Sequence, residues 1–186
     1  LGAIASRTNA FKLNEDIVLP LQALADFAMF VDGFNGEEDR YNQKTVVWQI
    51  GAVLEALEAT EDPQWLSDRL GPAGELCRQA IDLLEFAGKD ALREEKHLRH
   101  LIGELEGLFH GNPVCGRIRE SRAEVRRRLI IIATHMHAGD GNVHVNIPVF
   151  SNDRDMMIRA AETADAVMAR AVELEGVVSG EHGIGF

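Results

Sequence analysis

The chain has 186 residues, 46% of them hydrophobic, which fits one domain or one domain with a large insertion and excludes a disordered chain. Its formal net charge of −11 argues against nucleic acid as a partner, because phosphate binding requires a basic surface. No run of about 18 apolar residues occurs, so we expect no transmembrane segment. The chain starts without Met and stops inside a glycine-rich motif, so we interpret it as a piece of a longer protein.

The first elements are a strand and a helix. Residues 14–21 ("NEDIVLPL") form a β-branched, apolar run closed by Pro20, which predicts a strand that ends where a helix begins. Residues 21–34 carry apolar side chains at helical spacing. Gly33 and Gly36 predict the end of this helix.

A long helical block follows at residues 41–127. Asp62 before Pro63 is typical of an N-cap followed by a proline in the first turn. Asn112 and Pro113 predict a break between the last two helices. We interpret the whole block as an insertion.

Two groups of side chains in this block need an interpretation. The arginines between residues 117 and 128 could form an anion site, or a solvated helix face paired with Glu120 and Glu124. The acidic remainder of the chain favours the solvated face. Cys77 and Cys115 are isolated and lack metal-binding spacing, so we expect reduced, inert thiols and a cytoplasmic protein.

The last third of the chain changes character. Residues 129–138 and 142–150 are typical of strands, residues 153–176 of an amphipathic helix ended by Gly176, and a short strand follows. The order strand, helix, helical block, strand, turn, strand, helix, strand predicts an α+β fold. In this fold an antiparallel, ferredoxin-like sheet is covered by helices and interrupted by a large all-helical insertion.

The predicted boundaries of this arrangement follow from the same pattern. Residues 1–40 and 128–186 should form the sheet domain, and residues 41–127 should form the helical insertion.

The stretch "HAGDGNVH" at residues 137–144 predicts a metal-binding hairpin. With Asp140 and Gly141 as the two central residues of a tight turn, His137 lies directly opposite His144, and His135 shares their face. Opposed residues have Cβ atoms about 4.5–5.5 Å apart, so two imidazoles could bind one cation. A hairpin with surface histidines remains the alternative.

A second glycine-rich motif, "SGEHGIG", supplies further candidates. Two histidines plus one carboxylate form a catalytic zinc set with an open position, and Glu181 would be the carboxylate. His182 points away from its neighbour in an extended segment, so it is available as a general base. Gly180 and Gly183 allow a ligand or cofactor to approach the backbone closely. The motif does not match the dinucleotide-binding fingerprint.

The two motifs together resemble a known family. "HAGDGNVHVN" followed by "GVVSGEHGIG" is similar to the C-terminal domain of the FAD-linked oxidases, which include D-lactate, glycolate and D-2-hydroxyglutarate dehydrogenases. The resemblance covers residues 128–186 well and residues 12–34 more loosely. The long helical stretch looks like the large bacterial members that also carry iron–sulphur modules.

The resemblance implies that a D-2-hydroxy acid is oxidised to a 2-oxo acid, with hydride transfer to FAD. It implies that FAD is held mostly by an N-terminal domain of the same full-length chain. An iron–sulphur module is a candidate electron acceptor, and the sequence leaves the acceptor open. The protein would be cytoplasmic or peripheral to the inner membrane. The implied residues are His137, His144 and Glu181 for a divalent metal, expected to be zinc; His182 as the base; Asn146, Arg7 and Lys12 for substrate; and Gly141, Asn142 and Gly183 for the flavin.

Two other functions stay open at this point. The helical block could be a non-catalytic module that docks a partner domain or subunit. The same ligands could also support metal-dependent hydrolysis, which the resemblance disfavours. The identity of the hydroxy acid and the role of His135 are not fixed by the sequence.

Overall fold

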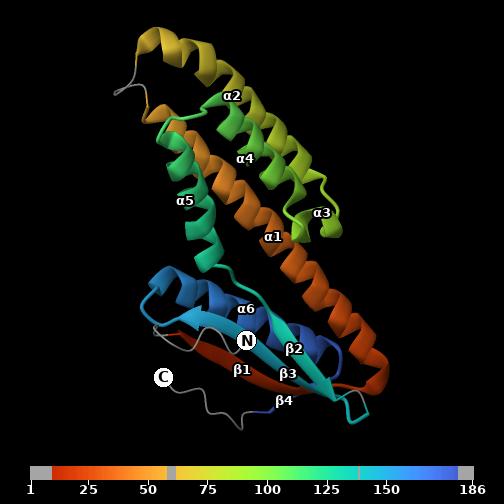
Figure 1. The fold of residues 1–186 in the computed structure, drawn as a ribbon. Helices are drawn as coiled ribbons and strands as arrows, with labels where there is room; N and C mark the ends of the chain where they lie inside the picture. The colour runs from red at the N-terminus through yellow and green to blue at the C-terminus, as the bar shows by residue number, and fades with distance from the viewer. Residues whose placement is uncertain (1–9, 58–61, 138, 180–186) are drawn as a thin grey trace. The chain divides into compact units, whose positions relative to one another are not determined.

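The computed structural model describes residues 10–57, 62–137 and 139–179 (Figure 1). The chain divides into two compact units, one built from the residues up to Asn35 and from Ile130 onward, the other from Gly36–Leu129. The strands are β1 (Ala10–Val18), β2 (Ala133–His137), β3 (Asn142–Phe150) and β4 (Val177–Ser179). The helices are the 3-10 turn η2 (Leu21–Ala23), α1 (Leu24–Glu55), α2 (Pro63–Glu85), α3 (Lys89–Arg93), α4 (Lys96–Leu108), α5 (Val114–Arg127) and α6 (Arg154–Glu173).

The sheet unit has the predicted α+β architecture. Its four strands are ordered β2-β3-β1-β4, and every neighbouring pair is antiparallel. With α1 after β1 and α6 after β3, this is the β-α-β-β-α-β arrangement of ferredoxin-like folds. Helix α6 packs against β1, β3 and β4 (Figure 1).

Alternation along β3 separates the two faces of this sheet. Val143, Val145, Ile147 and Val149 are buried, and the residues between them are half-buried. Successive strand residues point to opposite faces, so the valines and the isoleucine face the core below α6. The other face carries polar residues, as the sequence predicted.

Asn35, which lies about three turns inside α1, ties the segment before β2 to this helix. Its side-chain amide donates to the carbonyl oxygen of Ile132 and its side-chain oxygen accepts from the Ile132 amide, both at 2.9 Å. Ile132 is 2% exposed and enters the same core as Phe27. One side chain therefore satisfies both backbone groups of a residue outside the sheet.

Helix α1 is longer than predicted, because Gly33 and Gly36 do not end it. The helix runs without interruption over Leu24–Glu55. Neither glycine has the positive φ of a helix C-cap, and an interior glycine costs only about 1 kcal/mol relative to alanine. Apolar contacts on both sides outweigh this cost, since Val31 joins the sheet core and Ile50 joins the helical core.

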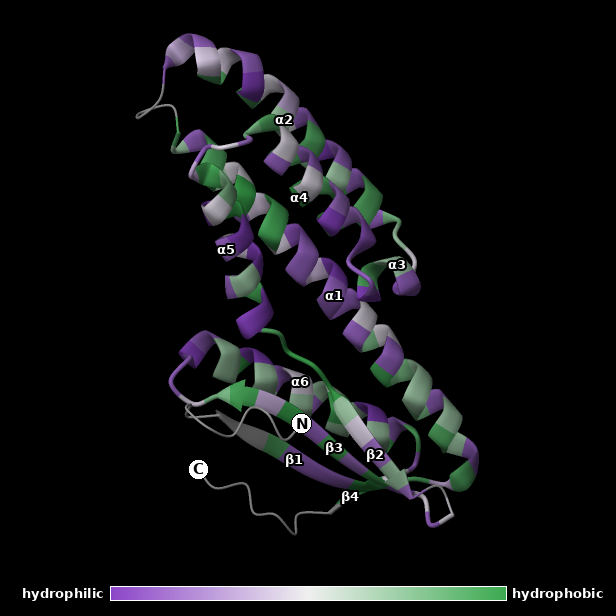
Figure 2. Cartoon of the chain, viewed as in Figure 1, coloured by the Kyte–Doolittle hydropathy of each residue, from purple (hydrophilic) through white to green (hydrophobic). Residues whose placement is uncertain are grey.

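The helical unit confirms the predicted cap and break. The Asp62 side chain accepts hydrogen bonds from the amides of Gln64 and Trp65, and Pro63 opens α2. The sequence missed one break: Glu95 has a φ of 50° and separates α3 from α4. The helices are amphipathic, and α5 is hydrophilic along much of its length (Figure 2).

The helical unit has its own core, and the two cysteines lie at its edge. Burial raises the pKa of the Cys77 thiol, in keeping with the inert thiol that we expected, and Cys115 is also a free, half-buried cysteine. No helix within the described ranges combines the length and apolarity needed to cross a bilayer. The central buried side chains of this core are Val46, Ile50, Leu84, Leu98, Leu105, Phe109 and Ile118.

Candidate functional site

The polar face of the sheet carries the candidate site. Strand register places residues from three strands side by side on it, because neighbouring strands bring opposed residues to the same face. Asp16 of β1 lies opposite His144 of β3, and Asn14 lies opposite Asn146. The described polar residues of this face are Asn14, Asp16, His135, His137, Asn142, His144 and Asn146.

The hairpin register differs from the prediction. His144 is opposite His135, and His137 is opposite Asn142. The connection is therefore not a two-residue turn centred on Asp140 and Gly141. Instead the Asp140 amide bonds the carbonyl oxygen of His137 at 3.0 Å, and Gly141 adopts a φ of 71° directly before β3.

A contact with β1's end explains this register. The Leu19 amide donates to the Gly141 carbonyl oxygen at 2.8 Å, and a Cβ at Gly141 would overlap the Leu19 carbonyl oxygen. Only glycine fits this close, left-handed position. The observed register is shifted by two residues from the predicted one, so every side chain keeps its face. His137 and His144 thus remain neighbours, although diagonally.

The three histidines form a compact cluster. Ring centroids are 5.1 Å apart for His135 and His137, 5.8 Å for His137 and His144, and 6.4 Å for His135 and His144. A zinc–nitrogen distance of about 2.0–2.1 Å places the ring centroids of two ligands to one ion about 5–6 Å apart. The pair His137 and His144 and the pair His135 and His137 both fit this range, whereas His135 and His144 lie outside it. In the part of the chain that the structure describes, no three His, Cys, Asp or Glu side chains converge as a complete metal site.

His144 has a carboxylate partner that the sequence analysis missed. Its Nδ1 lies 2.5 Å from Oδ1 of Asp16, across 128 residues of sequence. Asp16 is 16% exposed and His144 is 38% exposed by side chain, so the contact lies at the partly covered surface of the sheet. One feature of the sequence could have pointed to this partner. Asp16 lies within a β-branched run predicted to be a strand, where aspartate is disfavoured.

The structure describes some of the other predicted site residues and leaves four of them outside the described ranges. Asn146 is on the polar face, and the buried Oδ1 of Asn142 has no hydrogen-bond partner among the described residues. Lys12 lies in β1 opposite Pro148. The contact with Leu19 accounts for the glycine at 141 without a flavin. Arg7, Glu181, His182 and Gly183 lie outside the described residues.

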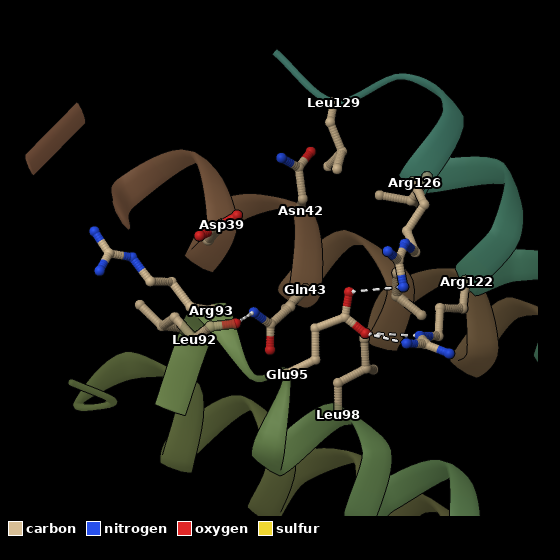
Figure 3. A pocket seen from close by; sticks show the side chains of 12 residues that line it. Asp39, Asn42, Gln43, Leu92, Arg93, Glu95, Leu98, Arg122, Arg126 and Leu129 are labelled. Carbon is tan, nitrogen blue, oxygen red and sulfur yellow. Dashed lines mark hydrogen bonds and ion pairs between the residues drawn. The ribbon is translucent and has the colours of Figure 1, made fainter. Parts of the chain in front are cut away.

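The helical unit contains a separate, partly open cavity of about 40 Å³ lined by residues of α1, α3, α4 and α5 (Figure 3). Gln43, 5% exposed, donates from Nε2 to the Leu92 carbonyl oxygen at 2.7 Å, whereas its buried Oε1 has no partner among the described residues. Arg122 and Arg126 both reach the Glu95 carboxylate there, at 2.5 and 3.6 Å. A buried water needs about 10–15 Å³, so the cavity has room for water beside Gln43.

These ion pairs bear on the interpretation of the arginines. Arg119 pairs with Glu106 at 2.6 Å, and Glu95 takes two further arginines, so these three side chains pair with residues that precede α5. The predicted pairs with Glu120 and Glu124 were the wrong partners for these three arginines. These ion pairs join α5 to Glu106 of α4 and to Glu95 just before α4. The arginines therefore form a solvated, salt-bridged helix face.

The fold and the polar face define a ferredoxin-like α+β domain with a cluster of three histidines on one face of its sheet. Comparison with known proteins identifies the family: residues 112–186 match the FAD linked oxidases, C-terminal domain. The chain belongs to this family, as its two glycine-rich motifs predicted. FAD is the cofactor that defines the family.

Curated relatives agree with this assignment. D-lactate dehydrogenase of Anaerostipes hadrus is 46% identical over 153 residues, covering 74% of this chain and 32% of the relative. D-lactate dehydrogenase of Archaeoglobus fulgidus is 43% identical over 139 residues, covering 72% and 30%. Glycolate oxidase subunit GlcD of Bacillus subtilis is 39% identical over 56 residues, covering 30% and 12%. The chain spans about a third or less of these relatives, and no solved structure matches it significantly.

Proposed function

We propose that this chain is the substrate- and metal-binding part of an FAD-dependent dehydrogenase that oxidises a D-2-hydroxy acid to a 2-oxo acid. The observation that carries the proposal is the cluster of His137 and His144 on the open polar face, at a ring separation of 5.8 Å. Family membership and relatives named D-lactate dehydrogenase and glycolate oxidase support the substrate class. The FAD-binding domain would belong to the same full-length chain.

In this proposal His137, His144 and Glu181 hold a divalent metal, zinc being the expected ion. When bound, such an ion acts as a Lewis acid toward the 2-hydroxyl and carboxylate of the substrate. FAD, when bound, would supply the hydride-accepting chemistry. His182 takes the hydroxyl proton as general base, because a neutral imidazole accepts protons near neutral pH.

The substrate would lie across the polar face. Asn146 offers an amide that donates and accepts hydrogen bonds beside the histidine cluster. Arg7 and Lys12 would bind the substrate carboxylate by charge-assisted hydrogen bonds. Gly141, Asn142 and Gly183 would line the flavin side.

The test is metal binding by the chain and turnover by the full-length enzyme. We expect isothermal titration with ZnCl2 to give one site, which His137→Ala and His144→Ala each abolish, whereas His110→Ala leaves it unchanged. His110 is exposed on the helical unit and is the matched control. In the full-length enzyme, dye reduction with a panel of D-2-hydroxy acids should fall at least 100-fold in both site variants. Unchanged zinc binding and turnover in both would overturn the proposal.

We also propose a second role, in which the helical unit docks an iron–sulphur partner that accepts electrons. Tyr41 and Trp48 favour it, since they are 50% and 57% exposed and lie two turns apart on α1. The variant Tyr41→Ser/Trp48→Ser should slow electron transfer from the reduced full-length enzyme to its iron–sulphur partner and leave dye reduction intact. Val172→Ser, at a 63% exposed valine of α6, is the control. Equal transfer rates in all three proteins would contradict this role.

A further inference from the structure

We propose that Asp16 is a positioning residue that holds His144 in the tautomer with the proton on Nδ1, so that Nε2 is its ligand atom. The inference rests on the proposed metal-binding function, which it deepens. It concerns a residue of β1, far in sequence from the glycine-rich motifs. The first observation is the 2.5 Å contact between Asp16 Oδ1 and His144 Nδ1.

The chemistry of the contact fixes the proton. An ionised carboxylate can only accept hydrogen bonds, so the nitrogen that faces it must carry hydrogen. In a neutral imidazole the other nitrogen, Nε2, then has the lone pair. Metal-binding histidines usually donate their second nitrogen to a carboxylate or carbonyl in this manner, and the donation sets ring orientation and raises ligand basicity.

The backbone holds both partners in place. Asp16 is directly opposite His144 in the antiparallel β1–β3 pair, the longest pairing in the sheet. Three residues after Asp16, just beyond the end of β1, the Leu19 amide donates to the Gly141 carbonyl oxygen at 2.8 Å. The end of β1 is therefore fixed to the segment that enters β3, so Asp16 and His144 have little freedom to separate.

A purely structural ion pair is the competing explanation. Removing such an ion pair would lower the stability of the sheet. It would not make the zinc affinity of the folded chain change together with the tautomer of His144. Positioning predicts that tautomer and affinity change together. The two explanations therefore differ in what is measured on the folded protein.

The experiment uses the 186-residue chain and the variants Asp16→Ala, Asp16→Asn and Asn14→Ala. Asn14 is exposed, shares the face and strand of Asp16, and lies opposite Asn146, so it is the matched control. Long-range 1H–15N spectra without metal identify which nitrogen of His144 carries the proton. We expect an Nδ1-protonated His144 in the wild type and in Asn14→Ala, and loss of this tautomer in Asp16→Ala. Asp16→Asn, which keeps an acceptor oxygen, should retain it at least in part.

Titration with ZnCl2 then measures the consequence. We expect about 10- to 100-fold weaker binding in Asp16→Ala, an intermediate loss in Asp16→Asn, and no change in Asn14→Ala. An unchanged His144 tautomer in Asp16→Ala would overturn the inference, and so would a changed tautomer with unchanged zinc affinity. Absence of zinc binding in the wild type would overturn the proposed metal function, and the tautomer result without metal would still decide whether Asp16 orients the ring.

Discussion

Replacing Gly141 by alanine should loosen the sheet unit at the point where the site is assembled. The residue has a φ of 71°, which costs an L-residue about 1–2 kcal/mol. The added methyl group would overlap the Leu19 carbonyl oxygen, so the segment must move and the 2.8 Å bond from the Leu19 amide is weakened or lost. Such a bond contributes about 0.5–1.5 kcal/mol, and the whole change should destabilise the unit by about 1.5–3.5 kcal/mol.

Hydrogen exchange of β3 measures this change. A loss of about 1.5–3.5 kcal/mol corresponds to exchange about 10- to 400-fold faster for amides that exchange when the unit opens. Trp48 and Trp65 both lie in the helical unit, so their fluorescence reports on that unit and serves as an internal reference. Gly139→Ala is the matched control, since a Cβ there meets nothing within 4 Å. Equal protection of β3 in Gly141→Ala and Gly139→Ala would refute the reasoning.

Two further changes test the packing of each unit. Asn35→Ala removes both hydrogen bonds to the Ile132 backbone and should cost about 1–3 kcal/mol, measured by hydrogen exchange of the segment before β2; unchanged protection would contradict this account. Burial, partly offset by Arg93, raises the pKa of Asp39, so the folded chain binds that proton more tightly than the unfolded chain and loses stability as pH rises through the raised pKa. Asp39→Asn should therefore stabilise the helical unit at neutral pH in urea unfolding followed by tryptophan fluorescence, and the gain should disappear in acid below the ordinary carboxyl range. A gain that persists in acid would contradict the assignment.

Structural features that depend only on residues close together in the sequence were predicted correctly. The alternation of Val143, Val145 and Ile147 with polar residues assigned the faces of β3, because strand side chains alternate whatever the strand's partners are. Asp62 and Pro63 located the start of α2 for an equally local reason, since a cap acts on amides two or three residues away.

The failures arose where distant contacts decide. Gly33 and Gly36 looked like a helix end, but their small local cost is outweighed by the packing of α1 on both sides of them. Periodicity could not distinguish hairpin registers that differ by two residues, because both give the same faces.

The sequence by itself determined the family, the order of the strands along the chain and the presence of His137 and His144 on one polar face. Only the tertiary structure decided which imidazoles lie opposite each other and that Asp16 contacts His144. Both features depend on the position of β1. Asp16 of this strand is 128 residues from His144 in sequence, and only the pairing of β1 with β3 brings the two side chains together. Local propensity carries no information about such a pairing, whereas the fit of Leu19 against Gly141 fixes it.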